Sequence, residues 1–182
     1  MNRWWHGFGP AMPVLPAQET ARASIGAALG LFLTAAILWA LDGAGTPLMS
    51  SAVLIAPFGA SAFLIFSFPA SPFAQPWPAV VGNTISALAA LGVLQLGLPM
   101  LPAISLAVLL AMVAMSLARA LHPPGGAVAI ATVLLARADH MPALSFALMP
   151  VCAGTAALVV AGVLWNLATG RAYPVPPMPR GG

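Results

Sequence analysis

Apolar runs long enough to cross a bilayer follow one another along this chain, and they constrain its fold more than any other feature. Hydrophobic residues make up 61% of the 182 residues and charged residues only 5%, whereas about a quarter of a typical soluble domain is charged. Because backbone polar groups must be paired in lipid, spans of this kind are helical. The sequence therefore predicts an all-α integral membrane protein.

Six runs approach the roughly 20 residues that a transmembrane helix needs. They cover about 24–41, 48–68, 78–98, 101–120, 123–136 and 144–168. The fifth run is short, and only a segment with glycine and proline separates the third from the fourth. We predict six transmembrane helices, while a count of four would follow if two of the runs only dip into the membrane.

The segments that flank these runs have a different composition. Residues 1–22 contain three prolines and lack the apolar centre of a signal peptide, while Trp4, Trp5 and Phe8 suit the bilayer interface. Residues 169–182 are rich in proline, which is typical of disorder. We therefore divide the chain into an interfacial N-terminal tail (1–22), a transmembrane domain (23–168) and a disordered C-terminal tail (169–182).

The arginines orient the predicted spans, because cytoplasmic loops carry an excess of Lys and Arg. With six spans and the N-terminus inside, only Arg137 lies outside, and the cytoplasmic side holds Arg3, Arg22, Arg119, Arg171 and Arg180. We expect a multi-pass protein of a bacterial inner membrane with both termini in the cytoplasm. Six positive charges along the chain are too few for a nucleic-acid footprint.

The two halves of the chain resemble each other weakly. Pro57 and Gly59 match Pro123 and Gly125 at an offset of 66 residues, and 87–94 match 157–164 at five of eight positions. Two repeats, at about 23–98 and 101–168, would each hold three spans, and an odd number of spans inserts the second repeat upside down. The predicted fold is therefore six transmembrane helices in two inverted three-helix repeats, with broken helices at the two Pro-Gly motifs.

The Pro-Gly motifs suggest a binding site made of backbone. Proline favours the first turn of a helix, and each helix N-terminus carries about half a positive charge. Two such ends that face each other would suit a small monovalent anion, which glycine lets the backbone approach closely. The predicted helix breaks are Pro57, Pro123 and Pro124, and the predicted anion-binding residues are Gly59, Ala60, Ser61, Gly125, Gly126 and Ala127. Alternatively, both breaks are kinks that only let helices pack.

Two further polar residues, and one pair of glycines, have open roles. His122 is either a gate or proton site, or a cap on the preceding helix. Asn83 should face a neighbouring helix or the pore near the anion. Gly26 and Gly30 form a GxxxG motif, which permits close helix contact within the bundle or in a homodimer.

Enzymatic function is not supported by the residues. The sequence has no paired carboxylates, no cluster of metal ligands and no glycine-rich nucleotide loop, so we expect neither catalysis nor a cofactor. The hypotheses that remain are a transporter or channel for a small anion, a membrane anchor that holds a partner, and, more distantly, an intramembrane enzyme that uses His122.

Four stretches of the sequence together resemble the HPP family of integral membrane proteins, which is named for a His-Pro-Pro motif. They are His122-Pro123-Pro124 with the glycines that follow, 56–62, 72–78 and Gly82-Asn83, so the resemblance covers about residues 20–168. The family is usually described as having four spans, its plant and cyanobacterial members are associated with nitrite transport, and some bacterial members carry a further regulatory domain. The resemblance therefore implies a stand-alone transport module for nitrite or nitrate.

Overall fold

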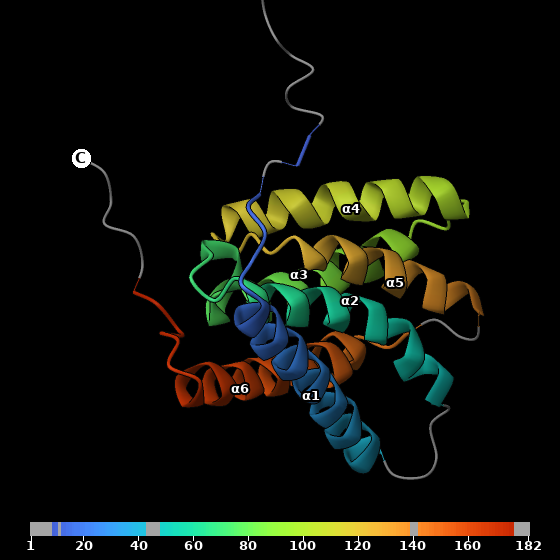
Figure 1. The fold of residues 1–182 in the computed structure, drawn as a ribbon. Helices are drawn as coiled ribbons and strands as arrows, with labels where there is room; N and C mark the ends of the chain where they lie inside the picture. Colours follow the sequence, from blue (N-terminus) through green and yellow to red (C-terminus); the bar gives the residue numbers. More distant parts are fainter. Residues whose placement is uncertain (1–8, 11, 43–47, 139–141, 177–182) are drawn as a thin grey trace, which may run out of the picture.

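The computed structural model describes residues 9–10, 12–42, 48–138 and 142–176, and the regular structure in these residues is entirely helical (Figure 1). The α-helices are α1 (Ala17–Asp42), α2 (Leu48–Ser67), α3 (Pro76–Leu94), α4 (Met100–Leu117), α5 (Pro124–Ala138) and α6 (Ala153–Ala168). A 3-10 turn, η3 (Pro72–Ala74), precedes α3, and a π-helical turn, η4 (Ala147–Cys152), leads into α6. The expectation of an all-α membrane protein is confirmed at this level.

Four helical segments are long and apolar enough to cross a membrane: Ala17–Ala40, Pro76–Leu94, Met100–Leu117 and Ala147–Ala168. Two more apolar helical segments, Ala56–Ser67 and Pro124–Ala136, are parts of helices that have 20 and 15 residues in all. The two short segments belong to α2 and α5, which are the helices that carry the Pro-Gly motifs. Length and composition thus support four spans directly and leave the crossing of α2 and α5 as a prediction.

The helices pack in a pattern that repeats between the two halves of the chain. In the first half α1 packs on α2, and in the second α4 packs on α5. Across the halves, α3 packs on α4 and α5, α6 packs on α1 and α2, and α2 packs on α5 and α3 on α6. If α1, α2 and α3 are exchanged with α4, α5 and α6, in that order, the same set of helix pairs results. Two structurally related halves would produce this symmetry.

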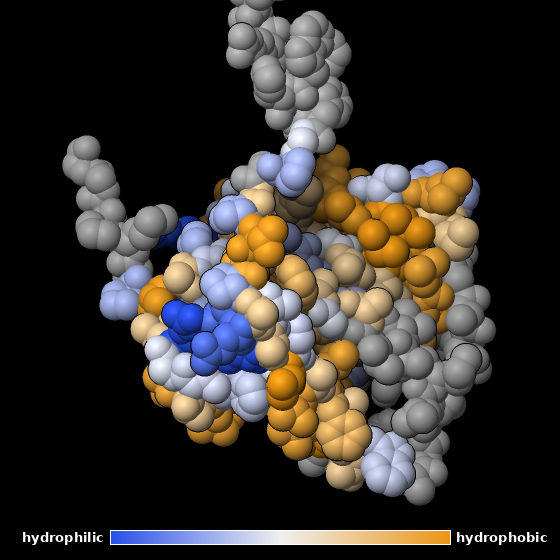
Figure 2. All heavy atoms as spheres, viewed as in Figure 1, coloured by the Kyte–Doolittle hydropathy of each residue, from blue (hydrophilic) through white to orange (hydrophobic). Residues whose placement is uncertain are grey.

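Small residues on α3 allow this close packing. Its buried face includes Ala79, Gly82, Ala87 and Ala90, and residues of this size let membrane helices approach one another closely. The large apolar side chains of the outer helices lie on the surface, as Phe32 and Trp39 of α1 and Leu101 and Leu117 of α4 do. Figure 2 shows such hydrophobic residues over much of the visible surface, as expected of helices that face lipid.

The two prolines at the repeated motif behave differently. Pro124 begins α5, which confirms a helix start at the His-Pro-Pro motif, with Pro123 just before it. Pro57 lies inside α2, so the predicted helix start there is wrong. A proline inside a membrane helix is tolerated because neighbouring groups satisfy the one carbonyl that it leaves unpaired. A break that the sequence analysis did not single out occurs at Met149 and Pro150, where η4 interrupts the last span.

The part of the C-terminal tail that the structure describes packs on the bundle. Tyr173 is fully buried, and its hydroxyl donates a hydrogen bond of 2.8 Å to the carbonyl of Ala74. The backbone N–H of Val175 donates to Gln75 Oε1 at 2.9 Å. The prediction of disorder is therefore wrong for residues 169–176. The proline-rich composition did not indicate that a single aromatic residue, Tyr173, would hold this segment on the bundle. Residues 177–182 lie outside the described residues.

Loops and helix ends gather at one end of the bundle, on the left in Figure 1. Besides the contact of Tyr173 with Ala74, Trp77 Nε1 donates to the carbonyl of Ala118 at 3.3 Å, and Arg22 donates to the carbonyl of Phe66 at 2.8 Å. The start of α1, the α2–α3 connection and the ends of α4 and α6 thus meet there. Arg22, Arg119 and Arg171 all lie at this end, and its cytoplasmic orientation stays a prediction. Arg3, Arg180, the side chain of Arg137 and the aromatic residues of the N-terminal tail lie outside the described part.

Candidate functional site

Four polar side chains meet inside the largely apolar bundle. They are Ser61 of α2, Asn83 of α3, His122 just before α5, and Thr155 of α6, and each has 0% of its surface exposed. Two come from the first half of the chain and two from the second. We call these four residues the central cluster. Three of its members were predicted from the sequence, whereas Thr155 was not, because it is one of several hydroxyls in apolar helices and carries no distinguishing signal.

Hydrogen bonds connect the cluster in an unbroken chain. His122 Nδ1 lies 2.7 Å from the carbonyl oxygen of Phe73, and His122 Nε2 lies 3.0 Å from Ser61 Oγ. Asn83 Nδ2 lies 3.2 Å from Ser61 Oγ and 3.2 Å from Thr155 Oγ1. His122 is therefore buried within the site rather than being a cap on α4.

The carbonyl of Phe73 fixes the direction of each bond. A carbonyl only accepts, so His122 Nδ1 carries a hydrogen and donates it. A neutral imidazole that donates from Nδ1 carries no hydrogen on Nε2, so in this form Nε2 accepts from the Ser61 hydroxyl. That hydroxyl has a single hydrogen, so Asn83 turns its NH2 group toward Ser61 and Thr155.

These directions leave one atom of the cluster unpaired. Asn83 Oδ1 is buried and accepts no hydrogen bond from the described residues. An unpaired buried polar atom is costly, and the large majority of such atoms in folded proteins find a partner. Asn83 Oδ1 is thus the position at which a ligand could add a hydrogen bond to the cluster.

The predicted pair of facing helix N-termini is wrong. Gly59 and Ala60 lie within α2, where the backbone N–H groups belong to a continuing helix. The N–H groups of Gly125 and Gly126 donate to the carbonyls of His122 and Pro123, at 2.8 and 3.1 Å. These glycine N–H groups are therefore already paired, and Ala127 follows them in the first turn of α5. The backbone at the His-Pro-Pro motif closes a turn instead of exposing donors.

Glycine serves close packing around the cluster instead. A Cβ atom at Gly125 would lie 2.6 Å from Ser86 Oγ and 2.9 Å from Met115 Sδ. At Gly82 it would lie 2.6 Å from the carbonyl oxygen of Ala120 and 2.9 Å from His122 Cβ. These two glycines therefore let the segment around His122 lie directly against α3, which brings its ring to Ser61. At the His-Pro-Pro motif, the alternative interpretation therefore applies, in which the Pro-Gly break lets helices pack closely.

The GxxxG motif also serves contacts within the chain. Gly26 faces the side chains of Trp165 and Phe66, and a Cβ atom at Gly30 would lie 2.6 Å from the Phe66 ring. Of the two roles considered for this motif, the structure shows close contact of α1 with α2 and α6. A homodimer remains a prediction, and the GxxxG motif does not support it, because its glycines contact helices of the same chain.

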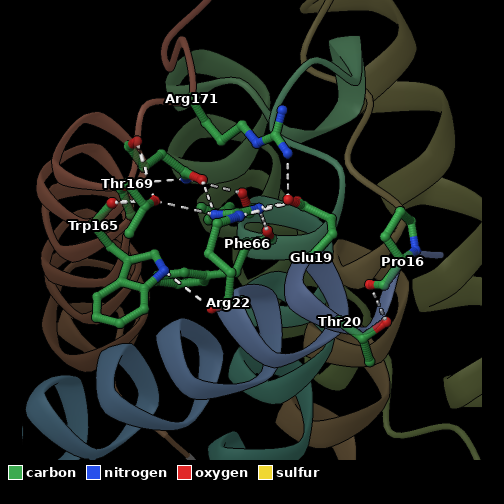
Figure 3. A network of polar contacts seen from close by, with 11 residues as sticks. Pro16, Glu19, Thr20, Arg22, Phe66, Trp165, Thr169 and Arg171 are labelled. Atoms are coloured by element: carbon green, nitrogen blue, oxygen red, sulfur yellow. Dashed lines mark hydrogen bonds and ion pairs between the residues drawn. The ribbon is translucent and has the colours of Figure 1, made fainter.

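A second polar network lies at the end of the bundle where loops gather (Figure 3). Arg22 donates to Glu19 Oε1 from Nε at 3.0 Å and from Nη2 at 2.6 Å, and its Nη1 donates to Asn166 Oδ1 at 3.0 Å. Arg171 pairs with the other carboxylate oxygen of Glu19. From the sequence, these arginines only indicated the orientation of the spans. The signal in the sequence for this network is Asn166, a buried polar residue in an apolar helix.

A surface cavity of about 520 Å³ opens beside this second network. Two arginines and one glutamate line it, so its side chains carry one net positive charge; the lining residues are Pro16, Gln18, Glu19, Arg22, Thr169 and Arg171. Figure 2 shows hydrophilic residues gathered over the adjoining ends of α1 and α6. A net positive mouth of this kind attracts small anions.

The charges and the possible metal ligands near the central cluster limit its chemistry. Within the described ranges, no group of three or more His, Cys, Asp or Glu residues could hold a metal ion. The buried residues there include no Asp, Glu, Lys or Arg either. The central cluster thus offers neutral hydrogen-bonding groups alone.

Comparison with known proteins identifies the type of membrane protein. Two transmembrane proteins of Dictyostelium discoideum are each 36% identical to this chain, over 127 and 129 residues. The alignments cover 67% and 68% of this chain but 40% and 45% of the relatives, so the chain spans less than half the length of the curated relatives it matches. Both relatives are eukaryotic, and the bacterial inner membrane stays a prediction.

No solved structure matches this chain significantly. The family model for the HPP transmembrane region matches residues 12–174, which include every helix described above. By this match, the chain belongs to the HPP family of transmembrane proteins.

Proposed function

We propose that this protein transports a small monovalent anion across a membrane, with the central cluster as its binding site. The observation that carries the proposal is the convergence of Ser61, Asn83, His122 and Thr155, from both halves of the chain, at one buried place. Polar residues inside membrane bundles are costly and commonly mark substrate paths. Nitrite and nitrate are the first candidates, because the sequence resembles a family associated with nitrite transport.

The character of the cluster fits a transporter. A fixed buried charge would hold an ion tightly, whereas neutral hydrogen-bonding groups bind more weakly and release more readily. The cluster joins α2 and α3 to α6 and to the segment before α5, so a movement of one half against the other would open it. Movement of this kind between two repeats is a common transport mechanism.

The wider architecture supports the same proposal. The exchange symmetry of the helix contacts favours two three-helix repeats, and three spans per repeat would make them inverted. The end of the bundle with Arg22, Arg119 and Arg171 is the proposed cytoplasmic side. The positively charged cavity at that end would concentrate anions near the path.

The test is flux of nitrite and nitrate into proteoliposomes, with two matched threonine variants. Thr155 and Thr132 are both fully buried, and each hydroxyl donates to a carbonyl four residues earlier at 2.8 Å. Only Thr155 also contacts Asn83. Thr155→Val should lose one hydrogen bond of about 1 kcal/mol, which corresponds to about fivefold in flux if the bond acts at the limiting step.

Thr132→Val should keep the flux of the unmodified protein, because its hydroxyl is not part of the cluster. If both variants lose the same fraction of the flux, the loss comes from weakened helices, and the central cluster is not the binding site. Absence of flux for every small anion tested would instead favour the membrane-anchor hypothesis, which binding of a partner to the purified protein would then support.

A further inference from the structure

The unpaired oxygen of Asn83 bears on the form in which a substrate is bound. Asn83 Oδ1 is an acceptor, it is fully buried, and it has no partner among the described residues. A bare anion also offers only acceptors, so its lone pairs would face those of the amide oxygen. We propose that the central cluster binds its substrate as the neutral, protonated acid, whose O–H group donates to Asn83 Oδ1. This inference rests on the proposed function and specifies its substrate class.

The other groups of the cluster agree with this choice. Both hydrogens of the Asn83 amide are directed at Ser61 and Thr155, and the hydroxyl of Ser61 is directed at His122 Nε2. The hydroxyl of Thr155 is directed at the carbonyl of Val151. The donors of the cluster are thus already used, and the free hydrogen-bonding capacity is that of an acceptor.

The charges of the buried residues also favour a neutral substrate. His122 is neutral in this arrangement, and the buried residues of the described part include no Lys or Arg that could balance an anion. A charged group that enters a dry interior without a partner tends to take up or lose a proton instead. The anion of a weak acid can become neutral by binding one proton and enter in that form, whereas the anion of a strong acid cannot.

The proposal separates anions by the strength of their acids. Nitrite and formate are anions of weak acids, so each can take up one proton and cross as nitrous or formic acid. Nitrate and chloride are anions of strong acids and stay ionised in water. Each transport event moves one anion and one proton together, carries no net charge, and releases the proton on the far side. Nitrite is therefore favoured over nitrate.

The experiment uses proteoliposomes of the full chain that contain a pH-sensitive dye, with nitrite, formate, nitrate or chloride added outside. The anion taken up is measured beside the internal pH, because an anion that crosses without a proton leaves the pH unchanged. Nitrite and formate should acidify the interior at least about tenfold faster than nitrate or chloride, because a site built to accept a substrate O–H discriminates against ligands that lack it. Rates are compared with protein-free liposomes, since weak acids also cross lipid unaided. The protein-dependent rates should not change when a potassium gradient with valinomycin sets the membrane potential.

Two variants connect the selectivity to Asn83. Asn83→Leu keeps the approximate size of the side chain and removes the acceptor, so nitrite-dependent acidification should fall about tenfold or more, toward that of protein-free liposomes. Thr132→Val is the control, because this buried hydroxyl bonds only within its own helix. The elution volume and thermal midpoint in detergent show whether each variant is folded. If Asn83→Leu unfolds, the four-anion comparison with the unmodified protein decides alone.

The failures are distinguishable. Nitrate flux that equals nitrite flux, or flux that follows the membrane potential, would overturn the neutral-acid proposal while leaving anion transport in place. Full nitrite flux in a folded Asn83→Leu variant would overturn it as well. No protein-dependent flux of any of the four anions would overturn the proposed function itself.

Discussion

Gly125 and Gly126 are neighbours in the His-Pro-Pro motif, yet only one of them lacks room for a side chain. A Cβ atom at Gly125 would lie 2.6 Å from Ser86 Oγ, whereas one at Gly126 would have nothing within 4 Å. Gly125→Ala should therefore lower the free energy of unfolding by about 1–3 kcal/mol through overpacking. Gly126→Ala should leave it unchanged or raise it by up to about 1 kcal/mol, since alanine favours helix.

Thermal unfolding of the two variants in detergent measures this difference. The comparison is well matched, because both substitutions add the same methyl group one residue apart in the first turn of α5. Equal midpoints for the two variants would show that α5 can move away from Ser86 and Met115 without loss, against the packing role assigned to Gly125.

The same two glycines show what a single sequence could predict at the residue scale. The motif pointed to the central cluster, since His122 bonds to Ser61, which in turn bonds to Asn83. It did not show the role of the glycines. A glycine that exposes a backbone N–H and a glycine that admits a neighbouring side chain look identical in sequence, and only the position of Ser86 on α3 distinguishes them.

At the scale of elements, the end of α4 positions His122. Ala120 N–H donates to the carbonyl of Met115 at 2.8 Å, and Arg119 N–H donates to that of Ser116 at 3.1 Å, which is a Schellman motif. Arg119 occupies its left-handed position with φ 54°, where a residue with a side chain is strained. The chain reverses direction there and reaches the cluster two residues beyond Ala120.

Arg119→Gly should therefore stabilise the protein by about 1 kcal/mol, because glycine adopts this conformation without the steric cost. Arg119→Ala is the control, since it removes the charge and keeps the strain. A rise of the thermal midpoint in the glycine variant alone is the expected result. If both variants rise equally, the charge of Arg119 rather than its backbone conformation would be the destabilising feature.

Helix boundaries were predictable where they depended on local chemistry. Pro124 begins a helix, as a proline in the first turn does, and the apolar runs located each of the six helices approximately. Pro57 was misjudged because the same residue can also lie inside a helix when the surrounding bundle supports it. Pro150 also lies in an apolar run, but there the backbone of Met149 is non-helical, and the turn η4 packs against α3.

At the scale of the whole molecule, contacts distant in sequence hold the loop-bearing end together. Tyr173 inserts beneath the α2–α3 connection, and burial raises the pKa of its hydroxyl above the ordinary range, so it stays protonated and donates to Ala74. The neighbouring residue of that connection, Phe73, holds His122 through its carbonyl. The C-terminal segment is therefore linked to the central cluster through one short connector, which composition alone could not predict.

Arg22 makes the densest set of contacts at this end, and its loss should be costly. Its side chain is 9% exposed and bonds Glu19, Asn166 and the carbonyl of Phe66, so it joins α1 to α2 and α6. Arg171 pairs with the same carboxylate from a side chain that is 50% exposed. Arg22→Leu should lower the free energy of unfolding by about 2–3 kcal/mol, because hydrogen bonds to a charged group contribute about 1.5–3 kcal/mol and those to Asn166 and Phe66 join different helices.

Arg171→Leu should cost about 0.5 kcal/mol, since exposed ion pairs contribute little. The two variants remove the same charge from the same carboxylate, so their difference isolates burial and the bonds to Asn166 and Phe66. Thermal midpoints in detergent should therefore fall far more for Arg22→Leu, and high salt should weaken only the contribution of Arg171. Similar losses in the two variants would mean that Glu19, rather than the contacts of Arg22 across helices, organises this end of the bundle.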